Sequence, residues 1–235
     1  MPRSWSIVDF VLVVLGGFLG AGVFLAVGLA LGNSEFLLVM GLAGQYAGHL
    51  FVLWLLGRNR DEGDLGFVIE GGDFRYLALG LLFQLVLAVL FLPLTTRLFP
   101  EGDSAQQIGD AISALETTPA RIAAVVVAVV LAPVTEELIF RGVLLKALGS
   151  KGRRTIMVVT ALVFAAFHML GLAPDALAAA ALVVLPQLFV IGLILAWVTL
   201  RTGRLGPAIF LHSGFNLLAA IALLIPQELL ESVTG

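Results

Sequence analysis

The sequence predicts an all-α membrane protein, a bundle of about seven transmembrane helices. Of the 235 residues, 60% are hydrophobic and only 12% are charged, whereas soluble domains are about 45–50% apolar and about 25% charged. The mean hydropathy is +1.08. The apolar residues gather in continuous stretches of bilayer length and do not alternate with polar residues, as the strands of a membrane β-barrel would.

Seven apolar stretches are long enough to span a bilayer, which takes about 20 helical residues each. The predicted spans are Ile7–Leu31, Phe36–Leu56, Tyr76–Leu98, Ile122–Leu148, Thr155–Leu172, Leu177–Leu200 and Ala208–Ile225. An eighth crossing follows if the segment 61–75 re-enters the membrane. The first stretch is too long for the apolar region of a signal peptide, so we expect it to be a retained span. The whole chain, 1–235, is then a single transmembrane domain.

Basic residues predict the orientation of this bundle. Seven spans put ten of them on the side of the N-terminus: Arg3, Arg58, Arg60, Arg75, Lys146, Lys151, Arg153, Arg154, Arg201 and Arg204. The other side holds two, Arg97 and Arg121. Because short cytoplasmic loops carry an excess of Lys and Arg, we expect the N-terminus in the cytoplasm.

Net charge and cysteine content exclude several classes of function. The net charge of −3 gives no reason to expect a nucleic-acid partner. The chain has no cysteine, which excludes a disulfide framework, a thiolate metal site and a cysteine nucleophile.

Charged residues inside a span indicate a functional site. Burying a charge at the bilayer centre costs from roughly 3 kcal/mol upward, so such groups usually have a partner and a function. The fourth span contains Glu136, Glu137 and Arg141. Glu137 and Arg141 are four residues apart, share a helix face and are expected to form an ion pair. Glu136 is turned by about 100° from Glu137 and has no basic partner one turn away, an environment that suits a general base.

Two later spans supply polar side chains that fit the same site. The fifth contains His168, and the seventh contains His212 and Asn216, which are four residues apart and face one way. Counting residues from the span ends places Glu136 and His168 near the midplane or the cytoplasmic half, and His212 joins them if the turn before it dips into the bundle. Pro133, three residues before Glu136, is expected to kink the fourth span.

Together these residues resemble a known family. Glu136-Glu137-xxx-Arg141, Phe164-xxx-His168 and His212-xxx-Asn216 are similar in order and spacing to the three motifs of the CPBP family of intramembrane proteases. This family is also called the CAAX protease and bacteriocin-processing or ABI family. The motifs cover roughly residues 134–216, and we expect the catalytic core helices within 121–225.

The resemblance implies a role for each residue. Glu136 and His168 would activate a water molecule, Glu137 and Arg141 would support Glu136, and His212 and Asn216 would stabilise the tetrahedral oxyanion. Zinc or another divalent metal is an open alternative, with Glu136, His168 and His212 as candidate ligands. We place a metal-free mechanism ahead of it, because the HExxH pattern is absent and Asn is a poor zinc ligand.

The resemblance also implies a setting for the protein. We expect an integral protein of a prokaryotic plasma membrane with its active site toward the cytoplasm. Its partners would be membrane lipids and a membrane-associated protein or peptide substrate, which in some relatives is lipidated. Two other functions stay open: a non-catalytic scaffold or bacteriocin-immunity protein that keeps these residues for structure, and a small transporter that uses them as a proton relay.

Overall fold

The computed structural model describes residues 4–32, 36–58, 60, 65–99, 115, 117–149, 151–172 and 177–224. Its helices are α1 (Ile7–Ala30), α2 (Leu37–Gly57), α3 (Arg75–Leu98), α5 to α7 (a continuous helix through 118–147), α8 (Arg153–Phe167), α9 (Leu177–Thr202) and α10 (Gly206–Leu224). Six helical stretches are long and apolar enough to cross a membrane, and Gly206–Ile221 adds a shorter apolar helix. The predicted all-α polytopic bundle is confirmed, and the protein is an integral membrane protein.

The segment before α3 does not form an eighth span in its described part. Residues 66–70 form neither helix nor strand, and a single 3-10 turn, η1 (Gly71–Phe74), leads into α3. Residues 61–64 lie outside the described residues. This segment accepts hydrogen bonds from the turn before α10: Leu205 N donates to Gly66 O at 2.8 Å and Gly206 N to Val68 O at 3.2 Å. The segment therefore fixes the point at which α10 begins.

The fourth span is not a regular α-helix. It consists of α5 (Thr118–Val126), a π-helical segment η2 (Val127–Leu131), α6 (Ala132–Glu137), a second π-helical segment η3 (Leu138–Leu144) and α7 (Leu145–Ala147). Pro133 has no backbone N–H to donate to the carbonyl of Val129 in η2, so the α-helical pattern of hydrogen bonds is interrupted there. Such π segments occur often at functional sites, and here they lie on both sides of Glu136 and Glu137.

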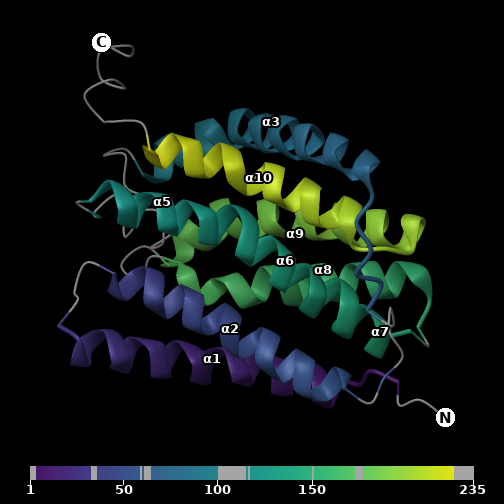
Figure 1. Ribbon diagram of the computed structural model, residues 1–235. Coiled ribbons are helices and arrows are strands. Elements are labelled where there is room, and N and C mark those ends of the chain that lie inside the picture. The colour runs from purple at the N-terminus through teal and green to yellow at the C-terminus, as the bar shows by residue number, and fades with distance from the viewer. Residues whose placement is uncertain are drawn as a thin grey trace.

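Glycines bring two pairs of helices into backbone contact. In Figure 1, α1 and α2 lie side by side at one edge of the bundle and α3 and α10 at the opposite edge. A Cβ on Gly48 of α2 would lie closer than 3.0 Å to the Gly16 carbonyl oxygen of α1, and a Cβ on Gly214 of α10 would lie equally close to Leu77 of α3. Small residues allow such close approach in lipid.

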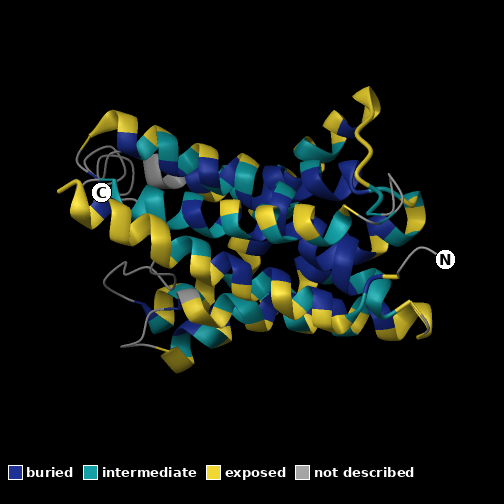
Figure 2. Ribbon diagram, turned by 60° about the horizontal axis from the view of Figure 1, so that its bottom comes forward, coloured by how far each residue is buried: buried dark blue, intermediate teal, exposed yellow. Residues whose placement is uncertain are grey.

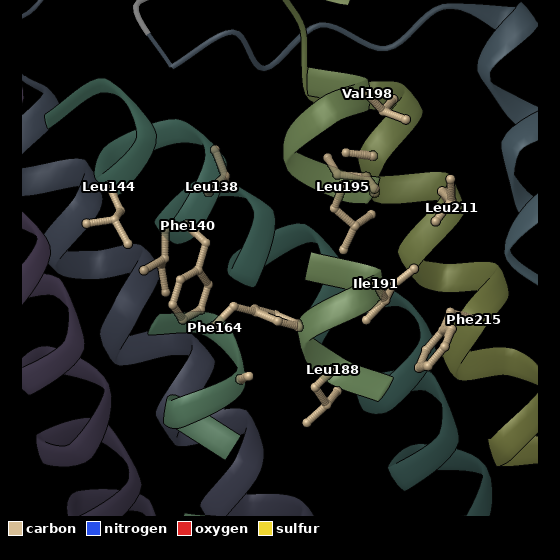
Figure 3. Close-up of a cluster of buried hydrophobic side chains, with 14 of the residues drawn as sticks. Leu138, Phe140, Leu144, Phe164, Leu188, Ile191, Leu195, Val198, Leu211 and Phe215 are labelled. Atoms are coloured by element: carbon tan, nitrogen blue, oxygen red, sulfur yellow. The ribbon is translucent and has the colours of Figure 1, made fainter. Parts of the chain in front are cut away.

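The outer surface is apolar and the centre of the bundle is closely packed. Figure 2 shows exposed residues along the outer helices and buried ones between them. Of the six stretches, Thr118–Ala147 is the most buried: 50% of an 18-residue apolar part of it lies inside the bundle, against 11% for Gly71–Leu98. In Figure 3, Phe164 lies between Phe140 and Ile191 of α9, and the two phenyl rings meet edge to face at 5.2 Å. The fourth span is therefore the central helix, surrounded by the others.

Candidate active site

Glu136 lies where three helices meet. Its Oε2 is 3.8 Å from Nε2 of His168, at the end of α8, and 3.8 Å from Nε2 of His212 in α10. Glu136 and His212 are buried, and His168 is partly exposed. The structure thus brings together the three side chains that the sequence places on separate spans.

Glu137 links the fourth span to both Arg141 and His212. Its Oε1 is 3.0 Å from Nη1 of Arg141 and 2.9 Å from Nδ1 of His212. The predicted ion pair with Arg141 is present, and both of its side chains are 0% exposed. A carboxylate oxygen accepts hydrogen bonds, so Nδ1 of His212 is the donor in this contact. Nε2 of His212 is thereby directed at Glu136.

Arg141 has two further contacts that hold it in place. Its Nη2 donates to the Gly192 carbonyl of α9 at 3.1 Å, and its guanidinium lies 4.5 Å from the centre of the Phe164 ring. The side chain therefore connects η3 to α8 and α9, in addition to neutralising Glu137.

His168 lies at the end of a helix and not within it. The sequence predicts a span through Thr155–Leu172, but α8 ends at Phe167 and His168 begins a 3-10 turn, η4 (His168–Gly171). Its backbone N–H bonds to Ala165 and Ala166, so the Phe164 carbonyl is available for Nδ1 of His168, at 2.8 Å. Since a carbonyl can only accept, Nδ1 is the donor in this bond, and Nε2 faces Glu136.

Asn216 lies one turn beyond His212 on α10 and is half-buried. Its Nδ2 donates to the Ala128 carbonyl at 2.9 Å. Ala128 belongs to the π-helical η2, where backbone carbonyls lack regular α-helical partners. One amide hydrogen of Asn216 therefore connects α10 to the central helix, and the second hydrogen is available to a ligand.

The spacing of the polar groups suits a water molecule better than a tetrahedral metal. Zinc bonds of about 2.0–2.1 Å with tetrahedral angles place neighbouring ligand atoms about 3.4 Å apart, and both nitrogen–oxygen distances here are 3.8 Å. In the described residues, no group of three His, Cys, Asp or Glu side chains is arranged to hold a metal ion. The arrangement of these described side chains therefore does not fit a tetrahedral zinc ion.

Sequence reasoning missed one residue of the site. Tyr46, in α2, is buried and its hydroxyl lies 3.3 Å from Oε1 of Glu136. The signal available in the sequence is a hydroxyl within an apolar span, flanked by Gly44 and Gly48, which allow α2 to pack closely.

The family comparison covers the part of the chain that holds the predicted site residues. Residues 118–218 match the family model Rce1-like, described as type II CAAX prenyl endopeptidase Rce1-like. This stretch is an Rce1-like domain. It contains all six predicted site residues, and the resemblance to the CPBP and CAAX protease family is confirmed. Tyr46 lies outside it. No curated protein and no solved structure matches the chain in these comparisons. The Rce1-like domain supports intramembrane endopeptidase activity in general.

Proposed function

We propose that the protein is an intramembrane endopeptidase that hydrolyses a peptide bond of a membrane-associated protein or peptide with a water molecule held by Glu136 and His168. The observation that carries this proposal is the convergence of two histidine nitrogens on one oxygen of a buried glutamate, at 3.8 Å each. Groups at that spacing leave room for a water between them, and a carboxylate with an imidazole can orient and deprotonate it.

In the proposed reaction Glu136 acts twice, first as the base and then as the acid. His168 Nε2 accepts a hydrogen bond from the water, and Glu136 takes its other proton as the oxygen attacks the carbonyl carbon. The C–O bond forms and the carbonyl oxygen becomes an oxyanion. Glu136 then returns the proton to the amide nitrogen as the C–N bond breaks, giving a free amine and a carboxylic acid. Glu136 ends the cycle in the carboxylate form in which it began.

The oxyanion would be stabilised by the free amide hydrogen of Asn216 and by His212. Because Nδ1 of His212 already donates to Glu137, Nε2 can donate to an oxyanion only when the ring is doubly protonated. Two carboxylates, one guanidinium and one imidazolium sum to zero charge, so this protonation state leaves the buried cluster neutral. Preorganised donors of this kind are worth about 3 kcal/mol each in a dry site.

The site is proposed to face the cytoplasm of a prokaryotic cell. This orientation follows from the ten basic residues predicted on the side of the N-terminus, against two on the other. A substrate that is lipidated near its cleavage site would reach the site from the bilayer.

Peptide hydrolysis by purified protein in lipid tests the proposal. Wild type is compared with Glu136→Gln, which removes the base and keeps the shape of the side chain. The control is Glu70→Gln, which changes an exposed glutamate outside the site. Substrates are a prenylated C-terminal peptide, its unprenylated form and a mixed peptide library, each with and without a chelator. We expect cleavage by wild type and Glu70→Gln, none by Glu136→Gln, and no effect of the chelator.

Each other outcome has a distinct meaning. Equal cleavage by wild type and Glu136→Gln would show a wrong base or a contaminant. Loss of cleavage on adding a chelator would overturn the metal-free mechanism. Full function in a cell-based immunity assay with Glu136→Gln would favour the scaffold, and substrate uptake into vesicles without cleavage would favour the transporter.

A further inference from the structure

The catalytic glutamate has a hydrogen-bond partner that comes from outside the Rce1-like domain. Tyr46 belongs to α2, 90 residues before Glu136, and its hydroxyl donates to Oε1 at 3.3 Å. The tyrosine is only 8% exposed. A hydrogen bond to a buried charged group is worth more than one at a surface, about 1.5–3 kcal/mol.

The two oxygens of the Glu136 carboxylate have different surroundings. Oε1 accepts from Tyr46. Oε2 has no hydrogen-bond partner among the described residues and faces the two histidine nitrogens. A carboxylate can turn about its last bond with little cost, so the donor on Oε1 decides where Oε2 points.

We propose that Tyr46 is a positioning residue, whose hydroxyl holds the Glu136 carboxylate in the rotation that directs Oε2 at the water between His168 and His212. This inference rests on the proposed function. It also means that the Rce1-like domain alone does not contain the complete active site, because α2 contributes a group to it.

The packing of α2 explains how Tyr46 reaches this position. Gly44 and Gly48 lie on either side of it in the sequence, and their missing Cβ atoms let α2 contact the backbone of α1. That contact fixes the rotation of α2 about its axis. The ring of Tyr46 then packs with Val127 and Ala132 of the central helix. The aromatic ring and the hydroxyl thus have separate partners, which makes them separable by mutation.

Tyr46→Phe tests the inference, because it keeps the packing with Val127 and Ala132 and removes only the hydroxyl. The matched control is Tyr76→Phe, which removes the hydroxyl of the chain's other tyrosine, a half-buried ring beside Arg75. Both variants are assayed with wild type and Glu136→Gln for kcat, KM and the thermal unfolding midpoint. For Tyr46→Phe we expect kcat to fall about 10- to 100-fold at unchanged KM. The unfolding midpoint should fall as well, because Oε1 of Glu136 loses its buried donor. Tyr76→Phe should match wild type.

The results separate this inference from the proposed function. If wild type is active, Glu136→Gln is inactive and Tyr46→Phe has the kcat of wild type, the role of Tyr46 is refuted and the endopeptidase stands. A change confined to KM or to the unfolding midpoint would also refute it, since a purely structural role would produce that result. Equal rates for wild type and Glu136→Gln would overturn both proposals.

Discussion

Arg141→Met removes the cation of the buried cluster while keeping a side chain of similar length. Glu137 would then lie in the centre of the bundle with only His212 as a partner, and the Gly192 carbonyl and the Phe164 ring would each lose a contact. Breaking a buried ion pair by removing one partner costs about 3–5 kcal/mol. The two lesser contacts of Arg141 together contribute a similar amount: about 1.5–3 kcal/mol for the charged hydrogen bond and about 0.5–2 kcal/mol for the cation–π contact.

The free energy of unfolding can be measured by denaturing-detergent titration in mixed micelles, followed by circular dichroism. We expect Arg141→Met to lose about 3–5 kcal/mol, and the control Arg58→Met to lose about 1 kcal/mol or less, since Arg58 is exposed and stacks on Trp54. Adding Glu137→Gln to Arg141→Met should recover part of the loss, because no unpaired charge then remains buried. A loss within about 1 kcal/mol of the Arg58→Met value, or a further loss in the double variant, would refute this reasoning.

Three further variants test other parts of the structure. Gly48→Ala should destabilise the protein by about 1–3 kcal/mol in the same titration. The control Gly22→Ala adds a Cβ that meets nothing within 4 Å, so it should be neutral or stabilising. Equal effects of the two variants would contradict the close packing of α1 and α2. Asp73→Asn should lower the unfolding midpoint, because this buried carboxylate accepts hydrogen bonds from the backbone of Glu70 and from Arg204. The control Glu70→Gln changes an exposed carboxylate that also pairs with Arg204, and it should change the midpoint little. Asn216→Ala should lower kcat by about 10²–10³-fold at unchanged KM if the amide binds the oxyanion, and a loss of stability alone would leave it a structural residue.

Much of the fold followed from the sequence, because the bilayer imposes a simple rule on it. A span of about 20 apolar residues must be helical to satisfy its own backbone, so six of the predicted spans correspond to helices long enough to cross a membrane. The backbone geometry inside the fourth span could not be predicted from the sequence. A proline predicts an interruption there, but the two π-helical segments depend on how neighbouring helices replace the missing hydrogen bonds.

The site was predictable to the extent that charge is costly in a membrane. Glu136, Glu137 and Arg141 were singled out for that reason, and the pair Glu137–Arg141 followed from helical spacing. Tyr46 was missed because a tyrosine is common in apolar spans and its contact with Glu136 is a long-range one. The end of α8 at Phe167 was missed as well, since the apolar run continues past it and hides the turn that begins at His168.

The two π-helical segments have a consequence for comparing this chain with its relatives. Each holds its hydrogen bonds between residues five apart, so the central helix contains more residues than an α-helix of the same rotation would need. Deleting a single residue between Glu137 and Arg141 would shorten their separation from four to three and turn everything beyond it by about 100°. Every motif letter would survive such a deletion, but Arg141 would be turned away from the Gly192 carbonyl and the Phe164 ring that it contacts. Length conservation between Pro133 and Gly142 is therefore a sharper criterion for an active relative than the identity of the motif residues alone.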